Sequence, residues 1–106
     1  MPSGLVPKHA ASLNNLAALL QDQGELAAAR PLLERSLAIR EKVLGPEHPD
    51  TATSLTNLAR LLKDQGELAE ARPLYERTLA IREKVLGPDH RDTAASRNNL
   101  AALLRE

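Results

Sequence analysis

The chain has 106 residues, with 14 basic and 14 acidic side chains, no cysteine and a formal net charge of zero. The charge balance gives no field to attract nucleic acid or an anionic membrane, and the lack of cysteine excludes disulfides, thiolate metal sites and cysteine nucleophiles. No stretch approaches the ~18 apolar residues of a membrane span, and no secretion signal precedes the chain's repeats, so we expect a soluble, cytoplasmic protein.

Residues 1–8 are expected to be a lead-in to the repeated part of the chain. The segment GLVPK is similar to a protease-cleavage linker, which would make part of the lead-in an engineered remnant. Pro7, however, lies 42 residues before Pro49 and in the same register, so a degenerate natural lead-in is an equal alternative. Met1 to Val6 therefore carry no part of the fold prediction.

The segment ASLNNLAALLQDQG predicts the first helix. It places Leu13, Leu16, Ala17 and Leu20 at the i, i+3, i+4, i+7 spacing of one helix face. Gly24 follows as the residue that most readily adopts the left-handed conformation at a helix end. A second helix is expected directly after this turn.

The segment ELAAARPLLERSLAIREKVLG predicts a longer second helix that ends at Gly45 and Pro46. Its expected apolar stripe consists of Leu26, Ala29, Leu33, Ser36, Leu37, Val43 and Leu44. Pro31 lies inside this helix, and Pro73 takes the same place in the next copy. Because an interior proline removes one backbone hydrogen bond, we expect a bend there rather than a break.

The sixteen residues LAIREKVLGPEHPDTA begin at Leu37, and a near copy begins at Leu79, 42 residues later. At this offset about 40 of 55 aligned residue pairs are identical, which is the signature of a tandem repeat. We expect one all-α domain over 9–106, with repeats at about 9–50 and 51–92, a half repeat at 93–106, and five helices in total. Each copy then buries the apolar face of its neighbour.

The segment NLAALLQDQGELAAARPLLERSLAI resembles the tetratricopeptide repeat (TPR), with an apolar position before a small residue, Gly at the turn and small residues in the second helix. The 42-residue period and the LNNLA and HPDTA segments resemble the kinesin light chain type of this repeat. The resemblance implies a right-handed α-solenoid of helical hairpins. It also implies a non-catalytic scaffold that receives an extended peptide, an acidic one included, on the concave face of the first helix of each repeat.

On that face, amides would bind the peptide main chain and cations would bind an acidic group. The expected peptide-binding residues are Asn14, Asn15, Asn57, Arg60, Lys63, Asn98, Asn99 and Arg105. The expected full face also includes Thr56. Two interpretations without ligand binding stay open. The asparagines can hydrogen-bond neighbouring helices, and the charges can form an ordinary solvated surface.

Metal, cofactor and catalytic chemistry are not expected. His48 and His90 are repeat equivalents, so they should lie about one repeat apart and not converge on one metal ion. We expect them to cap helices or shape loops. No nucleophile elbow or Gly-rich phosphate loop is present.

The alternative function is self-assembly of a designed, consensus-derived or recently amplified module without a ligand of its own. An odd number of helices leaves the last one without a following partner, and an exposed apolar face usually marks an association site. Arg97, which replaces Leu55 of the second copy, is interpreted as a partial polar cap. The residues expected to form a homodimer through the C-terminal helix are Leu100, Leu103 and Leu104, with Leu103 facing water.

Overall fold

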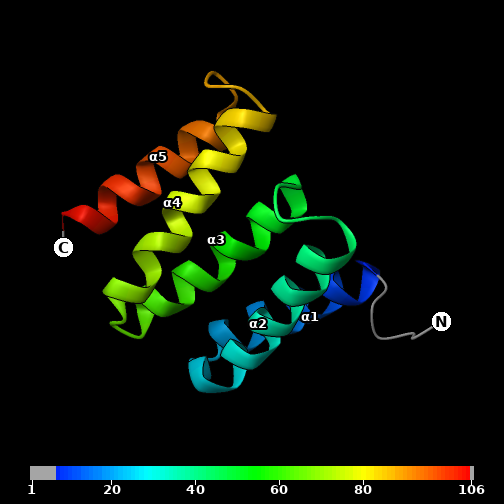
Figure 1. Cartoon of the computed structure of the whole chain (residues 1–106). Helices are drawn as coiled ribbons and strands as arrows, with labels where there is room; N and C mark the ends of the chain where they lie inside the picture. Colours follow the sequence, from blue (N-terminus) through cyan, green and yellow to red (C-terminus); the bar gives the residue numbers. More distant parts are fainter. Residues whose placement is uncertain (1–6, 106) are drawn as a thin grey trace.

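The computed structural model describes residues 7–105, which form an all-α repeat solenoid (Figure 1). In the described chain the helices are α1 (Pro7–Asp22), α2 (Leu26–Val43), α3 (Pro49–Asp64), α4 (Leu68–Val85) and α5 (Arg91–Leu104). The α1–α2 and α3–α4 hairpins stack through α2 and α3, and α5 packs on α4. Residues 1–6 and 106, and the expectations attached to them, lie outside the described residues.

The odd-numbered helices begin at residues 7, 49 and 91, which reproduces the 42-residue period. The first of these starts falls within the expected lead-in of residues 1–8. The domain and repeat boundaries given above therefore stay a prediction, and the helix starts favour counting each unit from Pro7, Pro49 and Arg91.

The two hairpin turns depend on glycine. Gly24 has φ = 79° and Gly66 has φ = 82°, values that L-residues with a Cβ rarely adopt. The chain reverses within these turns, where the Glu25 and Glu67 amides donate to the Leu20 and Leu62 carbonyls, both at 2.8 Å. The prediction of glycine turns between the helices of each pair is confirmed.

Both long helices continue through their internal prolines. Pro31 lies in the second turn of α2 and Pro73 lies at the same place in α4, and each side chain is exposed. The expectation that these helices would not break is confirmed.

The two loop histidines cap the helices that follow them. His48 Nδ1 accepts a hydrogen bond from the Asp50 amide at 3.0 Å, and His90 Nδ1 accepts one from the Asp92 amide at 3.0 Å. These bonds satisfy amides that the first turn of a helix leaves unpaired. The capping role expected for both histidines is confirmed.

The main core joins the two hairpins. Leu33 of α2 is buried in it together with small residues of α1 and α2 and leucines of α3. Tyr75, the equivalent of Leu33 in the second copy, is also buried there. A smaller cluster joins Leu55 of α3 to Ile81 of α4, with Leu37 of α2 packed against it. Apolar burial between successive repeats thus holds the solenoid together.

Some residues were assigned to the wrong face from the sequence. Leu16 and Val43, both expected in buried stripes, are 48% and 42% exposed. Thr56, expected on the ligand-binding face, is buried and donates to the Ala52 carbonyl at 3.0 Å. Leu16 is exposed because its side of α1 has no neighbouring helix among the described residues, whereas the equivalent Leu58 is 7% exposed beneath its neighbours.

A buried arginine and its half-buried equivalent join one repeat to the next, which the sequence alone did not indicate. Arg40 of α2 is buried, and its Nη1 donates to Ser54 Oγ of α3 at 3.0 Å. Arg82 of α4 donates in the same way to Ser96 Oγ of α5 at 2.8 Å. Burial lowers the pKa of Arg82, and the nearby Asp92 carboxylate opposes that shift.

Candidate functional site

A groove of about 220 Å³ lies between α1 and α3, and it contains several of the residues predicted for peptide binding. Its lining consists of Asn14, Ala18, Gln21 and Asp22 from α1, Leu33 from α2, and Asn57, Arg60 and Asp64 from α3. The helical spacing of three or four residues places these side chains on one side of each helix. Polar groups of two successive repeats therefore line one concave site.

Asn14, which lines this groove, carries an unsatisfied polar atom. Its Oδ1 is buried and has no hydrogen-bond partner. A buried acceptor without a donor costs about 1–3 kcal/mol, so such atoms are rare in folded proteins. A donor supplied by a ligand, for example a peptide amide, would remove this cost once the Asn14 side chain turns toward it.

The charges of the groove have both signs. Arg60 contributes one cation, while Asp22 and Asp64 contribute two carboxylates. Arg60 and both aspartates are exposed, so water screens their interactions. This lining suits a peptide that places one acidic group at Arg60, and it repels a run of acidic side chains.

The other predicted peptide-binding residues do not line the groove. They are Asn15, Lys63, Asn98, Asn99 and Arg105. Asn15, Asn98 and Arg105 are exposed, and Lys63 and Asn99 are partly buried. The structure thus brings Asn57 into the groove, and leaves its repeat equivalents Asn15 and Asn99 outside it.

The expectation that Leu103 faces water is wrong, while self-association through α5 stays a prediction. Leu103 does not face water, because it is 5% exposed and belongs to the main core. Leu100 packs against the same core and is partly buried. Leu104 is 55% exposed, whereas its equivalent Leu62 is 3% exposed. Leu103 is buried like its equivalent Leu61, whereas Leu104 lies on the side of α5 that no further helix of the described chain covers. The apolar surface at this end therefore includes Leu104 but excludes Leu103.

Arg97 is exposed on α5 in the place that the buried Leu55 occupies in α3. Its Nη2 donates to the Pro88 carbonyl at 2.9 Å and lies 3.6 Å from Glu83 Oε2. A charge is tolerated here because no further helix of the described chain covers this side of α5.

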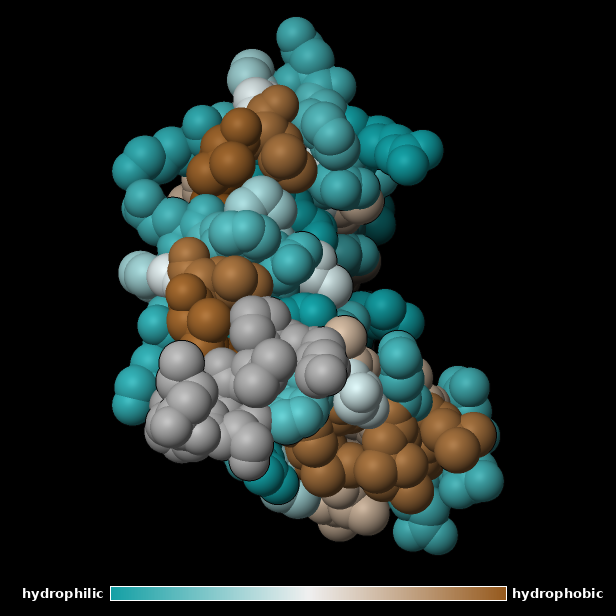
Figure 2. Space-filling model, turned by 90° about the vertical axis from the view of Figure 1, so that its right-hand side faces the viewer, coloured by the Kyte–Doolittle hydropathy of each residue, from teal (hydrophilic) through white to brown (hydrophobic). Residues whose placement is uncertain are grey.

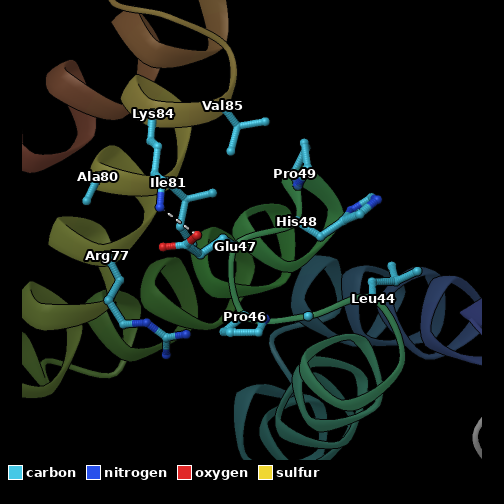
Figure 3. A pocket seen from close by; sticks show the side chains of 11 residues that line it. Leu44, Pro46, Glu47, His48, Pro49, Arg77, Ala80, Ile81, Lys84 and Val85 are labelled. Carbon is cyan, nitrogen blue, oxygen red and sulfur yellow. Dashed lines mark hydrogen bonds and ion pairs between the residues drawn. The ribbon is translucent and has the colours of Figure 1, made fainter.

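A larger hollow of about 720 Å³ lies between the α2–α3 loop and α4 (Figure 3). Its apolar wall includes Pro46, Ile81 and Val85, and its opening carries an ion pair of 2.9 Å between Lys84 Nζ and Glu47 Oε1. Sequence reasoning missed this site. The available signal was the identical EKVLGP segment in both copies, in which the valine was assigned to a buried stripe.

The hollow offers fewer polar side chains without an internal partner than the groove does. Arg77 at its edge forms an ion pair with Glu41 at 3.0 Å, so both of its basic side chains already have acidic partners. Neither cation needs a ligand to neutralise it. We therefore take the groove between α1 and α3 as the candidate site.

Residues 7–105 contain neither a metal-binding cluster nor a membrane-spanning helix. No cluster of three or more His, Cys, Asp or Glu side chains there is arranged to hold a metal ion. Within the same range, none of the helices has the length and apolar character needed to cross a membrane.

Comparison with known proteins gives matches over nearly the whole chain. The family model for the tetratricopeptide repeat matches residues 8–84 and 57–106. The solved structure of a Podosopora anserina protein, described as a kinesin light chain with nearly identical TPR-like repeats, superimposes with a TM-score of 0.88 at 36% identity. The match covers 97% of this chain and 48% of that one.

A single-substitution variant of the same fungal protein superimposes with a TM-score of 0.87 at 35% identity, covering 93% of this chain and 47% of that one. The chain thus spans about half the length of these solved proteins. A search of functionally curated proteins found no significant match.

Proposed function

Because the chain belongs to the tetratricopeptide repeat family, with repeats of the kinesin light chain type, we propose that it binds an extended peptide in the groove between α1 and α3. Repeats of this family generally mediate protein–protein interaction and are typically non-catalytic scaffolds. The observation that carries the proposal is the groove itself, which is lined by Asn14 and Asn57 of successive repeats and in which Asn14 has a buried oxygen without a hydrogen-bond partner.

In this proposal the two amides bind the peptide main chain. Each amide offers two N–H donors and one carbonyl acceptor, which match the groups of an extended backbone whatever its side chains are. Arg60 then selects one acidic side chain or a C-terminal carboxylate through a charge-assisted hydrogen bond. Asp22 and Asp64 select against further acidic residues beside it.

We expect Asn57→Ala combined with Arg60→Ala to weaken peptide binding by about 1–3 kcal/mol, because one amide and one charge-assisted contact are lost. The probe is a peptide that the parent chain selects from a random library, and its affinity is measured by calorimetry. Folding should change little, since Arg60 is exposed and Asn57 is only partly buried.

Asn99→Ala is the matched control, because this residue is the repeat equivalent of Asn57 but lies outside the groove. It should leave the affinity unchanged. Peptides that bind the double variant as tightly as the parent would refute the groove assignment. So would a large drop in melting temperature with peptide affinity retained, since both residues would then be structural.

Self-assembly through α5 is the second candidate function, and the exposure of Leu104 favours it. We expect light scattering at high micromolar concentration to show a dimer that Leu104→Glu converts to a monomer. The substitution should leave the helical signal intact, because this side chain is more than half exposed. A parent chain that stays monomeric under these conditions would exclude this function.

A further inference from the structure

One end of the groove between α1 and α3 carries two acidic side chains. α1 ends at Asp22 and α3 ends at its repeat equivalent Asp64, and both residues line the groove. Both helices run from the right to the lower left of Figure 1, so the two carboxylates lie at the same end of the groove. Figure 2 views the molecule from the opposite side, where these helices begin, and shows patches of apolar surface there. The acidic end is thus separate from that apolar surface.

The backbone makes the acidic end more negative still. The last carbonyl groups of a helix give its carboxyl end a partial negative charge, which favours a basic side chain there and disfavours an acidic one. α1 has no basic residue in its last turn, and its final residue is Asp22. The sequence therefore places a carboxylate where it does not stabilise the helix that carries it.

Neither carboxylate forms an ion pair within residues 7–105, with Arg60 or with any other cation. Exposed glutamates of α2 and α4 differ in this respect, because Glu41 pairs with Arg77 and Glu70 pairs with Arg30. Two like charges that line one groove repel each other, and a cation that enters between them relieves the repulsion.

The groove also holds a buried acceptor without a donor. This atom is Asn14 Oδ1, and Asn14 lines the groove about two helical turns before Asp22. Among the lining residues only Arg60 carries a positive charge. A matching ligand therefore brings hydrogen-bond donors along its length and a positive charge at the acidic end.

The spacing of opposite charges on α3 sets a spacing for the ligand. Asp64 follows Arg60 by four residues, which corresponds to about 6 Å along the helix axis. An extended peptide rises about 3.3 Å per residue, and every second side chain points to the same side. Peptide residues i and i+2 are therefore separated by nearly the same distance as Arg60 and Asp64.

We propose that the peptide bound in this groove carries a lysine or arginine two residues away from its acidic residue. The acidic side chain lies at Arg60, and the basic side chain lies between Asp22 and Asp64, where both carboxylates accept its charge-assisted hydrogen bonds. This inference rests on the proposed function, and it adds to it a ligand pattern of one acid and one base separated by one residue.

The test selects peptides from a random library displayed on phage, once with the parent chain and once with the Asp22→Asn, Asp64→Asn variant. We expect the parent to enrich peptides with a base two residues from an acid, and the variant to enrich the acid without the base. A peptide selected by the parent is then labelled and titrated. Changing its basic residue to glutamine should weaken binding to the parent about fivefold or more and leave binding to the variant unchanged.

The matched control is the Glu25→Gln, Glu67→Gln variant. These glutamates are repeat equivalents that are exposed, follow Asp22 and Asp64 by three residues, and do not line the groove. The control removes the same charge and should keep the parent's preference for the base. Circular dichroism should show that the aspartate variant melts at the same temperature as the parent or a higher one, because the lost carboxylates do not stabilise their helices.

Each other outcome has a distinct meaning. A parent that enriches acidic peptides without a nearby base would overturn this inference and leave the proposed function in place. A parent that enriches no peptide would overturn the proposed function and this inference with it. Loss of the base preference in the glutamate control would also overturn the inference, since net charge and not the groove would then select the base. The same holds if the aspartate variant melts well below the parent, because the carboxylates would then be structural.

Discussion

Replacing Leu55 with arginine is expected to destabilise the chain by about 4 kcal/mol or more, a large part of the 5–15 kcal/mol that typically stabilises a domain. Leu55 is fully buried between α2 and α4, where it packs with Leu37, Leu74 and Ile81. An arginine there loses its hydration without gaining an acidic partner in that cluster. Urea denaturation followed by circular dichroism measures the loss.

The third copy supplies a matched control, because Arg97 already occupies the equivalent position. The reverse change, Arg97→Leu, removes an exposed charge with an exposed ion pair, so its effect on unfolding should stay within about 0.5 kcal/mol. Equal effects of the two substitutions would show that the smaller cluster does not join the repeats as described. An increase in dimer content for Arg97→Leu would additionally support self-assembly through α5.

Leu33→Ala is expected to cost about 2–5 kcal/mol of folding free energy. Leu33 is 1% exposed and lies where both hairpins contribute to the main core, so its removal leaves a cavity that neighbouring helices cannot fill without moving. Both thermal and urea unfolding should report the loss, with one cooperative transition shifted to lower temperature and lower urea concentration.

Leu19→Ala is the control for that experiment. The same chemical change at an exposed position of α1 should alter stability by less than about 1 kcal/mol, because little apolar area returns to water. A comparable loss in both variants would mean that the exposed face of α1 is buried in solution.

Part of the candidate site could be predicted from the sequence. The resemblance to the tetratricopeptide repeat implied Asn14 of α1 and Asn57 and Arg60 of α3 as binding residues, and all three line one groove. The contribution of Leu33 to the groove could not be predicted, since it comes from a different helix. Of the three repeat-equivalent asparagines expected to bind peptide, Asn15, Asn57 and Asn99, only Asn57 lines the groove, because equivalent residues lie on different helices one repeat apart.

The local elements of this protein were determined by the sequence itself. Helix spans follow from the i, i+3, i+4 spacing of leucines and alanines, and the hairpin turns follow from glycines whose backbone conformation other residues disfavour. The caps at His48 and His90 and the tolerance of Pro31 also depend on neighbours a few residues away. Such features can be predicted from the sequence because the residues involved are close along the chain.

The burial of each leucine was decided by the tertiary structure alone. Leu16 and Leu58 have nearly identical sequence surroundings, as do Leu62 and Leu104, yet one of each pair is buried and the other is exposed. The difference arises because α3 is packed between the preceding helix α2 and the following helix α4, whereas no helix of the described chain precedes α1 or follows α5. Hydrophobic burial depends on which surfaces meet in space, and a repeated sequence specifies the same surface in every copy without specifying what covers it.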